Sequence, residues 1–145
     1  MQPLTSGLWS GTWDDGSLTP LQRLQLERSD VVSFHCYEGP AVMAERVAGL
    51  KRFGRPLVCT EYMARSQGST FEAILPLLAR EGVGAISWGL HRGRTQTHLP
   101  WATWAEPCPG EPEVWFHDIL WPDGRAYRAD EVDLIRDIAG GGHGK

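Results

Sequence analysis

The chain has 145 residues, of which 41% are hydrophobic and 22% charged, a balance that predicts one globular domain and excludes an intrinsically disordered chain. The net charge of −4 offers no basic surface for a phosphate backbone, so we expect no nucleic acid as a partner. No apolar run approaches the ~18 residues that a membrane span requires, so we expect no membrane partner either.

The opening residues, MQPLTSGLW, lack the basic start and apolar centre of a secretory signal. Their composition favours the cytoplasm, but a signal further upstream would leave the location unknown. Cys36, Cys59 and Cys108 are an odd set without C-x-x-C spacing, so they are predicted to be free thiols.

Four short apolar runs are predicted to be strands, and successive runs start 28, 26 and 26 residues apart. They are Pro3–Trp9, Val31–Tyr37, Leu57–Tyr62 and Val83–Gly89. The runs are hydrophobic on both faces, which is typical of parallel strands that helices cover.

Helix signals fill the segments between these runs. Thr19 is a capping residue before Pro20, a combination that predicts a helix start. After the second run, an apolar stripe along one helical face predicts a helix that Gly54 ends. The stripe consists of Met43, Val47, Leu50 and Phe53.

The last two predicted helices have start signals of their own. Ser69 and Glu72 form a predicted capping box. Pro76 should bend the helix that follows, and Gly82 should end it. Asp130 is the expected cap of the final helix, which runs into a glycine-rich tail.

Strands and helices that alternate at this period predict parallel βα units with right-handed crossovers. An open doubly wound sheet and a (β/α)8 barrel both fit, but no G-x-G-x-x-G or G-K-[ST] loop follows a predicted strand, which weakens a nucleotide-binding interpretation. A full barrel needs about 250 residues. The predicted fold is therefore α/β, with four parallel βα units forming half of a (β/α)8 TIM barrel over residues 1–139, and a flexible tail at 140–145.

Functional residues in such folds gather at the C-terminal ends of the strands. The predicted ends carry Trp9, Trp13, His35, Tyr37, Glu61, Tyr62, Trp88 and His91. Side-chain alternation puts His35 and Tyr37 on one face of their strand. It also puts Glu61 on the same face as Leu57 and Cys59. A carboxylate, a phenol, an imidazole and an indole on one rim are groups that a polysaccharide-cleaving site uses.

Five segments together carry a resemblance to a known family. They are VVSFHCY, PLVCTEYMAR, VGAISWGL, RTQTHLPW and WFHDILWPDGRAY. In this order and with these gaps they resemble the C-terminal half, barrel strands five to eight, of a cellulase-like glycoside hydrolase of the clan that includes family 5 (clan A). The resemblance covers residues 1–139.

The resemblance implies a role for several residues. Glu61 matches the catalytic nucleophile at the end of strand seven. His35 and Tyr37 match the pair that orients and hydrogen-bonds this nucleophile, and Trp88 matches the platform under the sugar. The implied activity is retaining hydrolysis of β-linked glycosides or polysaccharide, with no metal or organic cofactor.

The sequence departs from this family in one respect. Members of the clan carry the acid/base glutamate directly after an asparagine at the end of strand four, and this sequence contains no asparagine. Retaining hydrolysis needs two carboxyl groups about 5 Å apart. We therefore expect the chain to carry the nucleophile half of the site and to be inactive without the missing N-terminal half.

Other interpretations of the same residues are open. Glu61 could be a structural carboxylate paired with Arg65 or Arg92. His35 could be a core histidine, and the phenol and the indole could be packing groups. Three other acids could replace the proton donor, although they are more typical of loops and turns: Glu38, Asp14 and Asp15.

The segment Leu90–Asp118 is long enough to predict a site-forming loop, because unstructured stretches beyond about 12–15 residues are usually functional or disordered. Asp118 is expected to fasten this loop. The predicted substrate-binding residues are Trp88, Trp9, Trp101, Trp104 and Arg92.

Two other classes of function, a metal-dependent hydrolase and a non-catalytic binding module, can be compared with the sequence. A metal-dependent hydrolase would need a histidine cluster, and no pair has H-x-H or H-E-x-x-H spacing, so no metal site is predicted. The histidines considered were His35, His91, His98 and His117. A non-catalytic half barrel could instead bind carbohydrate or pair with a partner, because its first and last strands would have unpaired edges. We therefore expect an oligosaccharide or polysaccharide substrate, and either the missing N-terminal half-barrel or self-association.

Overall fold

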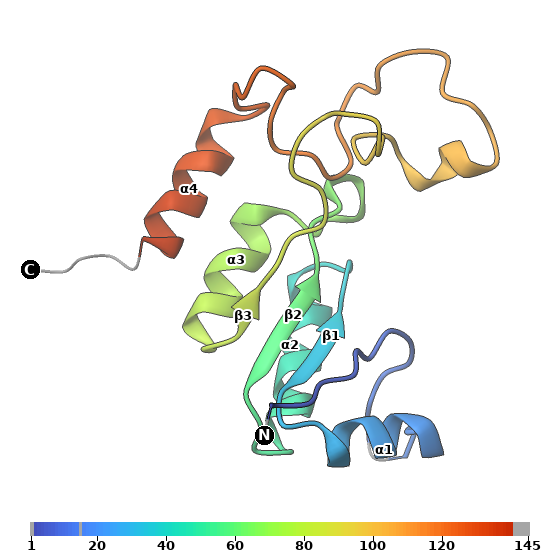
Figure 1. The fold of residues 1–145 in the computed structure, drawn as a ribbon, viewed down its shortest axis with the longest axis vertical. Coiled ribbons are helices and arrows are strands. Elements are labelled where there is room, and N and C mark those ends of the chain that lie inside the picture. The colour runs from blue at the N-terminus through green and yellow to red at the C-terminus, as the bar shows by residue number, and fades with distance from the viewer. Residues whose placement is uncertain (1, 15, 141–145) are drawn as a thin grey trace, which may run out of the picture.

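The computed structural model describes residues 2–14 and 16–140, which form an α/β fold around a small open parallel sheet (Figure 1). The sheet has three strands, in the order β1 (Val32–His35), β2 (Leu57–Glu61) and β3 (Gly84–Ala85). Both strand pairs are parallel, so the predicted class and pairing are confirmed. Asp15 and residues 141–145, most of the predicted tail, lie outside the described residues.

The run at 3–9 does not form a strand, so the prediction of four βα units is wrong. Leu8 makes a single parallel bridge with Phe34 of β1. Pro3 has no N–H to donate to a ladder, which disfavours a longer pairing. The segment still lies along the edge of β1, because the Leu8 N–H donates to the Ser33 carbonyl at 2.9 Å and the Leu8 carbonyl accepts the His35 N–H at 3.0 Å. The Leu4 side chain is 66% exposed.

The predicted last strand, at 83–89, shortens to β3, but its backbone stays paired beyond the strand. The Ile86 N–H donates to the carbonyl of Cys59 at 2.9 Å, and the Trp88 N–H donates to the carbonyl of Tyr62 at 3.2 Å. These bonds carry Trp88 to the same end of the sheet as the last residue of β2.

The helices lie where the sequence predicts them. They are α1 (Pro20–Arg28), α2 (Pro40–Lys51), α3 (Phe71–Arg80) and α4 (Ala129–Ala139), with the short 3-10 helices η1 (Arg65–Gln67) and η2 (Trp101–Trp104) between them. Thr19 caps α1 as predicted, because its hydroxyl accepts the Gln22 N–H at 3.2 Å. None of the described helices is long and apolar enough to cross a membrane.

Two predicted helix caps are wrong. Thr70, not Ser69, caps α3 by accepting the Ala73 N–H at 3.3 Å. The Ser69 hydroxyl is buried and accepts the Met63 N–H instead, so it holds the turn after β2. Asp130 lies inside the first turn of α4, where its charge favours the positive end of the helix without capping it.

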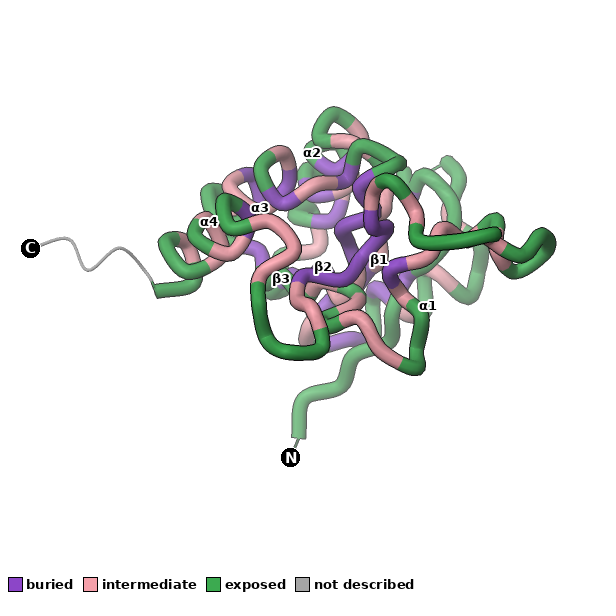
Figure 2. Tube along the Cα trace, turned by 90° about the horizontal axis from the view of Figure 1, so that it is seen from above, coloured by how far each residue is buried: buried purple, intermediate pink, exposed green. Residues whose placement is uncertain are grey.

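The core lies between the sheet and the helices α2 and α3, which cover one of its faces (Figure 2). The predicted stripe on α2 supplies Met43, Val47 and Leu50, each at most 1% exposed. Phe34 and Cys59 face them from the strands and are both fully buried. The other face of the sheet is therefore the one on which polar side chains can reach solvent.

A buried ion pair ties α4 to the residues that follow β2. Arg65 donates to both carboxylate oxygens of Glu131, at 2.8 and 2.6 Å, and the two side chains are 2% and 1% exposed. The same guanidinium donates to the carbonyls of Trp115 and Asp118 at 2.9 and 3.0 Å. One planar group therefore holds three segments together: the turn after β2, the long loop and α4.

We expect Glu131→Gln to lower the free energy of unfolding by roughly 3–5 kcal/mol, because it leaves the Arg65 charge buried without a counter-charge. Asp133→Asn on the same helix is the matched control, since Asp133 contacts Arg136 in an exposed ion pair. Its effect should stay within about 0.5 kcal/mol. Urea denaturation followed by far-UV circular dichroism measures both variants, and equal effects would contradict the prediction.

Candidate active site

Three predicted catalytic residues meet at the C-terminal ends of β1 and β2. Tyr37 donates its hydroxyl to Glu61 Oε2 at 2.8 Å, and His35 Nδ1 lies 3.3 Å from the same oxygen. The side chains of Glu61 and His35 are 21% and 23% exposed, so the carboxylate is shielded but still open to solvent. The other oxygen, Oε1, takes no hydrogen bond from the described residues, which leaves it available to a ligand.

The register of the sheet brings Glu61 to this position. Phe34 pairs with Cys59 on the core face. The next pair is His35 with Glu61, so one residue of β2 is skipped. Because His35 follows Phe34, its side chain points to the opposite face, and its partner Glu61 points the same way. The prediction that Glu61 shares a face with Leu57 and Cys59 is therefore wrong, since simple alternation cannot include a register shift.

Aromatic neighbours hold Tyr37 in place. Its ring lies edge-on to Trp101 at 5.0 Å between centroids and 5.6 Å from the ring of His117. His117 Nδ1 donates to the carbonyl of Met63 at 2.6 Å. Met63 has a φ of +75°, a conformation that is uncommon for a long side chain. The His117 contact therefore fixes a strained turn two residues after Glu61.

The sequence alone does not predict the supporting role of His117, which its pattern suggests only as a possible metal ligand. The available signal was its place in the run WFHDI, because a polar residue inside an apolar run must find a partner when it is buried. Residues 115–119 are all buried, and His117 is 1% exposed.

The protonation states in the site are set by burial. Burial and the neighbouring Glu61 carboxylate raise the pKa of Tyr37 well above its usual value. The phenol therefore stays protonated and donates to Glu61 throughout the physiological pH range. Burial also raises the pKa of Cys36 and Cys59 to about 12, so neither thiol is a nucleophile in the physiological pH range. All three cysteines are free, as predicted.

A cavity of about 560 Å³ opens over this cluster. Glu61, His35 and Tyr37 form its polar end. Four of the predicted substrate-binding residues line the remainder: Trp9, Trp88, Trp101 and Trp104. Three of these indoles are 46–85% exposed, Trp101 being the half-buried one, so they offer flat faces to a ligand instead of filling a core. The remaining tryptophan at a predicted strand end, Trp13, is 2% exposed and packs in the core.

Arg92 lies apart from the other predicted substrate-binding residues. It donates to both carboxylate oxygens of Glu111, at 3.0 and 2.7 Å, and it does not line the cavity over Glu61. Arg65 is likewise engaged, with Glu131. The alternative in which Glu61 pairs with Arg65 or Arg92 is therefore wrong.

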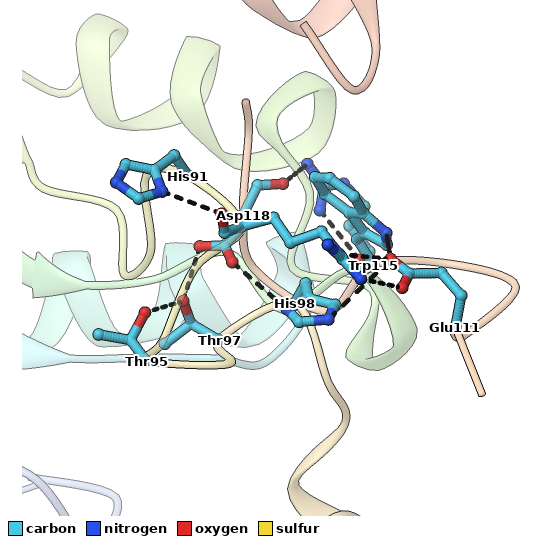
Figure 3. Close-up of polar contacts among 9 residues, drawn as sticks. His91, Thr95, Thr97, His98, Glu111, Trp115 and Asp118 are labelled. Atoms are coloured by element: carbon cyan, nitrogen blue, oxygen red, sulfur yellow. Dashed lines mark hydrogen bonds and ion pairs between the residues drawn. The ribbon is translucent and has the colours of Figure 1, made fainter. Parts of the chain in front are cut away.

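The long loop is fastened from inside by Asp118, as expected (Figure 3). Asp118 Oδ1 accepts the Thr97 hydroxyl at 2.6 Å, and its other oxygen lies 3.8 Å from His98 Nδ1. Glu111 accepts the Trp115 Nε1–H at 2.8 Å on the far side of the same cluster. These bonds anchor the loop that carries η2 and its two tryptophans.

The other candidate acids and ligands occupy less central positions. Glu38 lines the cavity, but it accepts the Cys36 thiol at 3.3 Å and lies 3.8 Å from Arg46. Asp14 folds back on its own turn, and its bond from the Thr12 hydroxyl lowers the pKa of its carboxyl. Within the described residues, no group of three histidine, cysteine or acidic side chains could hold a metal ion.

No protein family matches the chain, and none of the curated proteins matches it.

We expect the free energy of unfolding to fall as the pH drops below about 6.5. Burial lowers the pKa of His98 and His117 in the folded chain, so the unfolded chain binds protons that the folded chain cannot. Their stabilising contribution is therefore complete above the unfolded value of about 6.5 and is lost on acidification. Urea denaturation between pH 8 and pH 5 measures this loss.

His117→Gln should make that loss smaller between pH 7 and pH 5, because it removes one of the two buried titrating rings. His91→Gln is the matched control, since His91 is exposed. Parallel profiles for the parent chain and His117→Gln would show that His117 does not take part.

Proposed function

We propose that this chain carries the nucleophile half of a retaining glycoside hydrolase site that acts on β-linked glycosides or polysaccharide. The observation that carries the proposal is the cluster at Glu61, in which a neutral phenol and an imidazole hold one carboxylate oxygen at the end of a parallel strand. The indole-lined cavity over this cluster adds support, because indole faces suit the apolar faces of sugar rings.

In the proposed reaction, Glu61 Oε1 attacks the anomeric carbon and forms a glycosyl ester. The bond from that carbon to the leaving oxygen breaks, and the electron pair departs with the leaving group. Tyr37 and His35 act as positioning residues, because they hold Oε2 and so fix the rotation of the carboxylate. Trp88 would lie under the reacting sugar. Two carboxyl groups suffice for this chemistry, so it uses no metal or organic cofactor.

We further propose that the fold is half of a (β/α)8 TIM barrel, with the second carboxyl group supplied by an N-terminal half. The parallel pairing and the position of Glu61 at a C-terminal strand end support this proposal. The lack of asparagine supports it as well, because the acid/base motif of the clan that the sequence resembles begins with that residue. With natural glycosides, which need protonation of the leaving oxygen, the chain alone should be inactive.

A glycoside with a very good leaving group tests the nucleophile without the acid. 2,4-Dinitrophenyl 2-deoxy-2-fluoro-β-glycosides can release dinitrophenolate to a nucleophile without help from a general acid, and the fluorine stabilises the glycosyl ester that forms. We expect about one equivalent of dinitrophenolate per chain and a matching mass increase on the peptide that contains Glu61, from at least one of the gluco, manno, galacto and xylo reagents. Peptide mass spectrometry locates the label.

Two variants distinguish labelling at Glu61 from labelling elsewhere in the cavity. Glu61→Gln should abolish both the release and the label, whereas Glu38→Gln should keep both, because Glu38 lines the same cavity without the Tyr37 and His35 contacts. Label on any other residue, or no label with all four sugars, would reject Glu61 as the nucleophile.

A second candidate function is non-catalytic carbohydrate binding. Trp9 and Trp104 favour it, since they are 75% and 85% exposed beside the cavity and could bind sugar without any chemistry. Oligosaccharide affinity and 2-fluoroglycoside labelling measured on one preparation separate the two functions. Affinity without labelling supports the binding module.

The open sheet also supports a partner that completes it, either an N-terminal half-barrel or a second copy of the chain. At the β3 edge, Ile86 and Leu90 are 55% and 62% exposed. At the other edge Leu4 is 66% exposed beside the single bridge at Leu8. Exposed apolar side chains next to unpaired strand edges favour association.

We expect the isolated chain to self-associate, with a weight-average mass that rises with concentration in sedimentation velocity. Ile86→Lys should weaken this association, because a lysine at a strand edge opposes pairing. Ser66→Lys adds the same charge at an exposed position after β2 and is the control. A monodisperse monomer at every concentration, with a single cooperative unfolding transition, would contradict the prediction.

A further inference from the structure

A second cavity, of about 470 Å³, adjoins the one over Glu61. Trp88, Trp101 and Trp104 line both cavities and therefore form a shared indole wall. The rest of the second cavity is made by the loop around η2, which projects beyond the end of the sheet (Figure 1). Its volume lies in the range of small-ligand sites, which is about 300–1,000 Å³.

The lining of the second cavity combines apolar side chains with uncharged polar ones. It contains no aspartate, glutamate, lysine or arginine among the described residues. Its only titratable ring among the described residues is that of His117, and burial lowers the pKa of this ring, which favours the neutral form near pH 7. Hydroxyl and amide groups supply the polarity, from Thr95, Gln96, Thr97 and Thr103.

Some of the polar groups in the second cavity are free to bind a ligand. Thr97 and Thr103 already donate their hydroxyls, to Asp118 and to the carbonyl of Pro100. The Gln96 side chain makes no hydrogen bond within the described part of the chain, and Gln96 is exposed. It therefore offers an amide donor and an amide acceptor beside an indole wall.

We propose that the second cavity binds a further neutral sugar unit, next to the one held at Glu61, so that the ligand is an uncharged oligosaccharide of at least two units. This inference rests on the proposed function and assigns it a substrate class. Flat indole faces with hydroxyl and amide partners match a neutral sugar ring. An ionised sugar would lose hydration against this wall without gaining a counter-charge. The first cavity also opposes anions, because its charged groups are the carboxylates Glu38 and Glu61.

Cys108 supplies a reporter for this cavity. It lines the second cavity and is half-buried, whereas Cys36 and Cys59 are 2% and 0% exposed. A thiol reagent added to the folded chain should therefore react at Cys108 first. A ligand in the second cavity would cover this thiol, and a ligand confined to the first would not.

The experiment measures the rate of iodoacetamide labelling at Cys108 in Glu61→Gln, which cannot form the glycosyl ester. The probes are cellotriose, laminaritriose and mannotriose, with glucose and mannose as single-unit controls. We expect at least one trisaccharide at saturation to slow labelling by roughly tenfold or more, while the monosaccharides leave the rate unchanged. Cellobiouronic acid, an anionic analogue, should bind at least roughly tenfold more weakly than neutral cellobiose.

Filling the second cavity with a larger side chain provides an independent test, in which isothermal titration calorimetry measures trisaccharide affinity. Cys108→Trp should raise the trisaccharide Kd by roughly tenfold or more, and Cys108→Ser should leave it unchanged. Trisaccharide binding with full reactivity at Cys108 and no effect of Cys108→Trp would overturn the inference but leave the nucleophile proposal intact. Equal affinity for the anionic analogue, or no binding of any trisaccharide, would also overturn it. Failure of the nucleophile proposal is read separately, from the 2-fluoroglycoside label.

Discussion

The one-residue register shift between β1 and β2 is the constraint on which the site depends. Without it, Glu61 would follow Cys59 onto the core face, where an ionised carboxylate without a partner is costly to bury. The shift turns the last residue of β2 toward His35. Register shifts of this kind are enriched beside functional sites because they redirect a side chain without ending the strand.

The segments that surround the site are held by buried polar contacts, not by the sheet. Arg65 joins the turn after β2 to the long loop and to α4, and His117 joins the loop to the same turn at Met63. Buried polar groups are expensive to leave unpaired, so these contacts stabilise the loop in this arrangement. Trp101 and Trp104, which lie on this loop and form part of the indole wall, therefore depend on the stability of these contacts.

Much of the site could be predicted from the sequence because strand ends and side-chain chemistry are local properties. The meeting of His35, Tyr37 and Glu61 follows from two neighbouring parallel strands, β1 and β2, that end at one edge of the sheet. The register shift could not be predicted, because it arises from pairing between strands and has no single-residue signal. The reduction of the first predicted strand to a single bridge at Leu8 also depends on pairing between segments, which the apolar run alone does not reveal. The pairing of Arg92 with Glu111 is a contact within a long loop, where pattern rules have little force.

The partners of Glu61 differ from those of a typical structural carboxylate. A structural carboxylate in a folded domain is usually neutralised by an arginine or lysine, and both arginines expected near it are committed to other acids. Glu61 accepts the Tyr37 hydroxyl and lies 3.3 Å from His35 Nδ1, so its nearest polar partners are a neutral phenol and an imidazole instead of an arginine or lysine. A carboxylate oriented by a neutral donor, with one oxygen facing an indole-lined cavity, has the properties that attack on a sugar carbon requires. Because one oxygen of Glu61 has polar partners and the other has none among the described residues, we assign Glu61 the role of nucleophile in the proposed function.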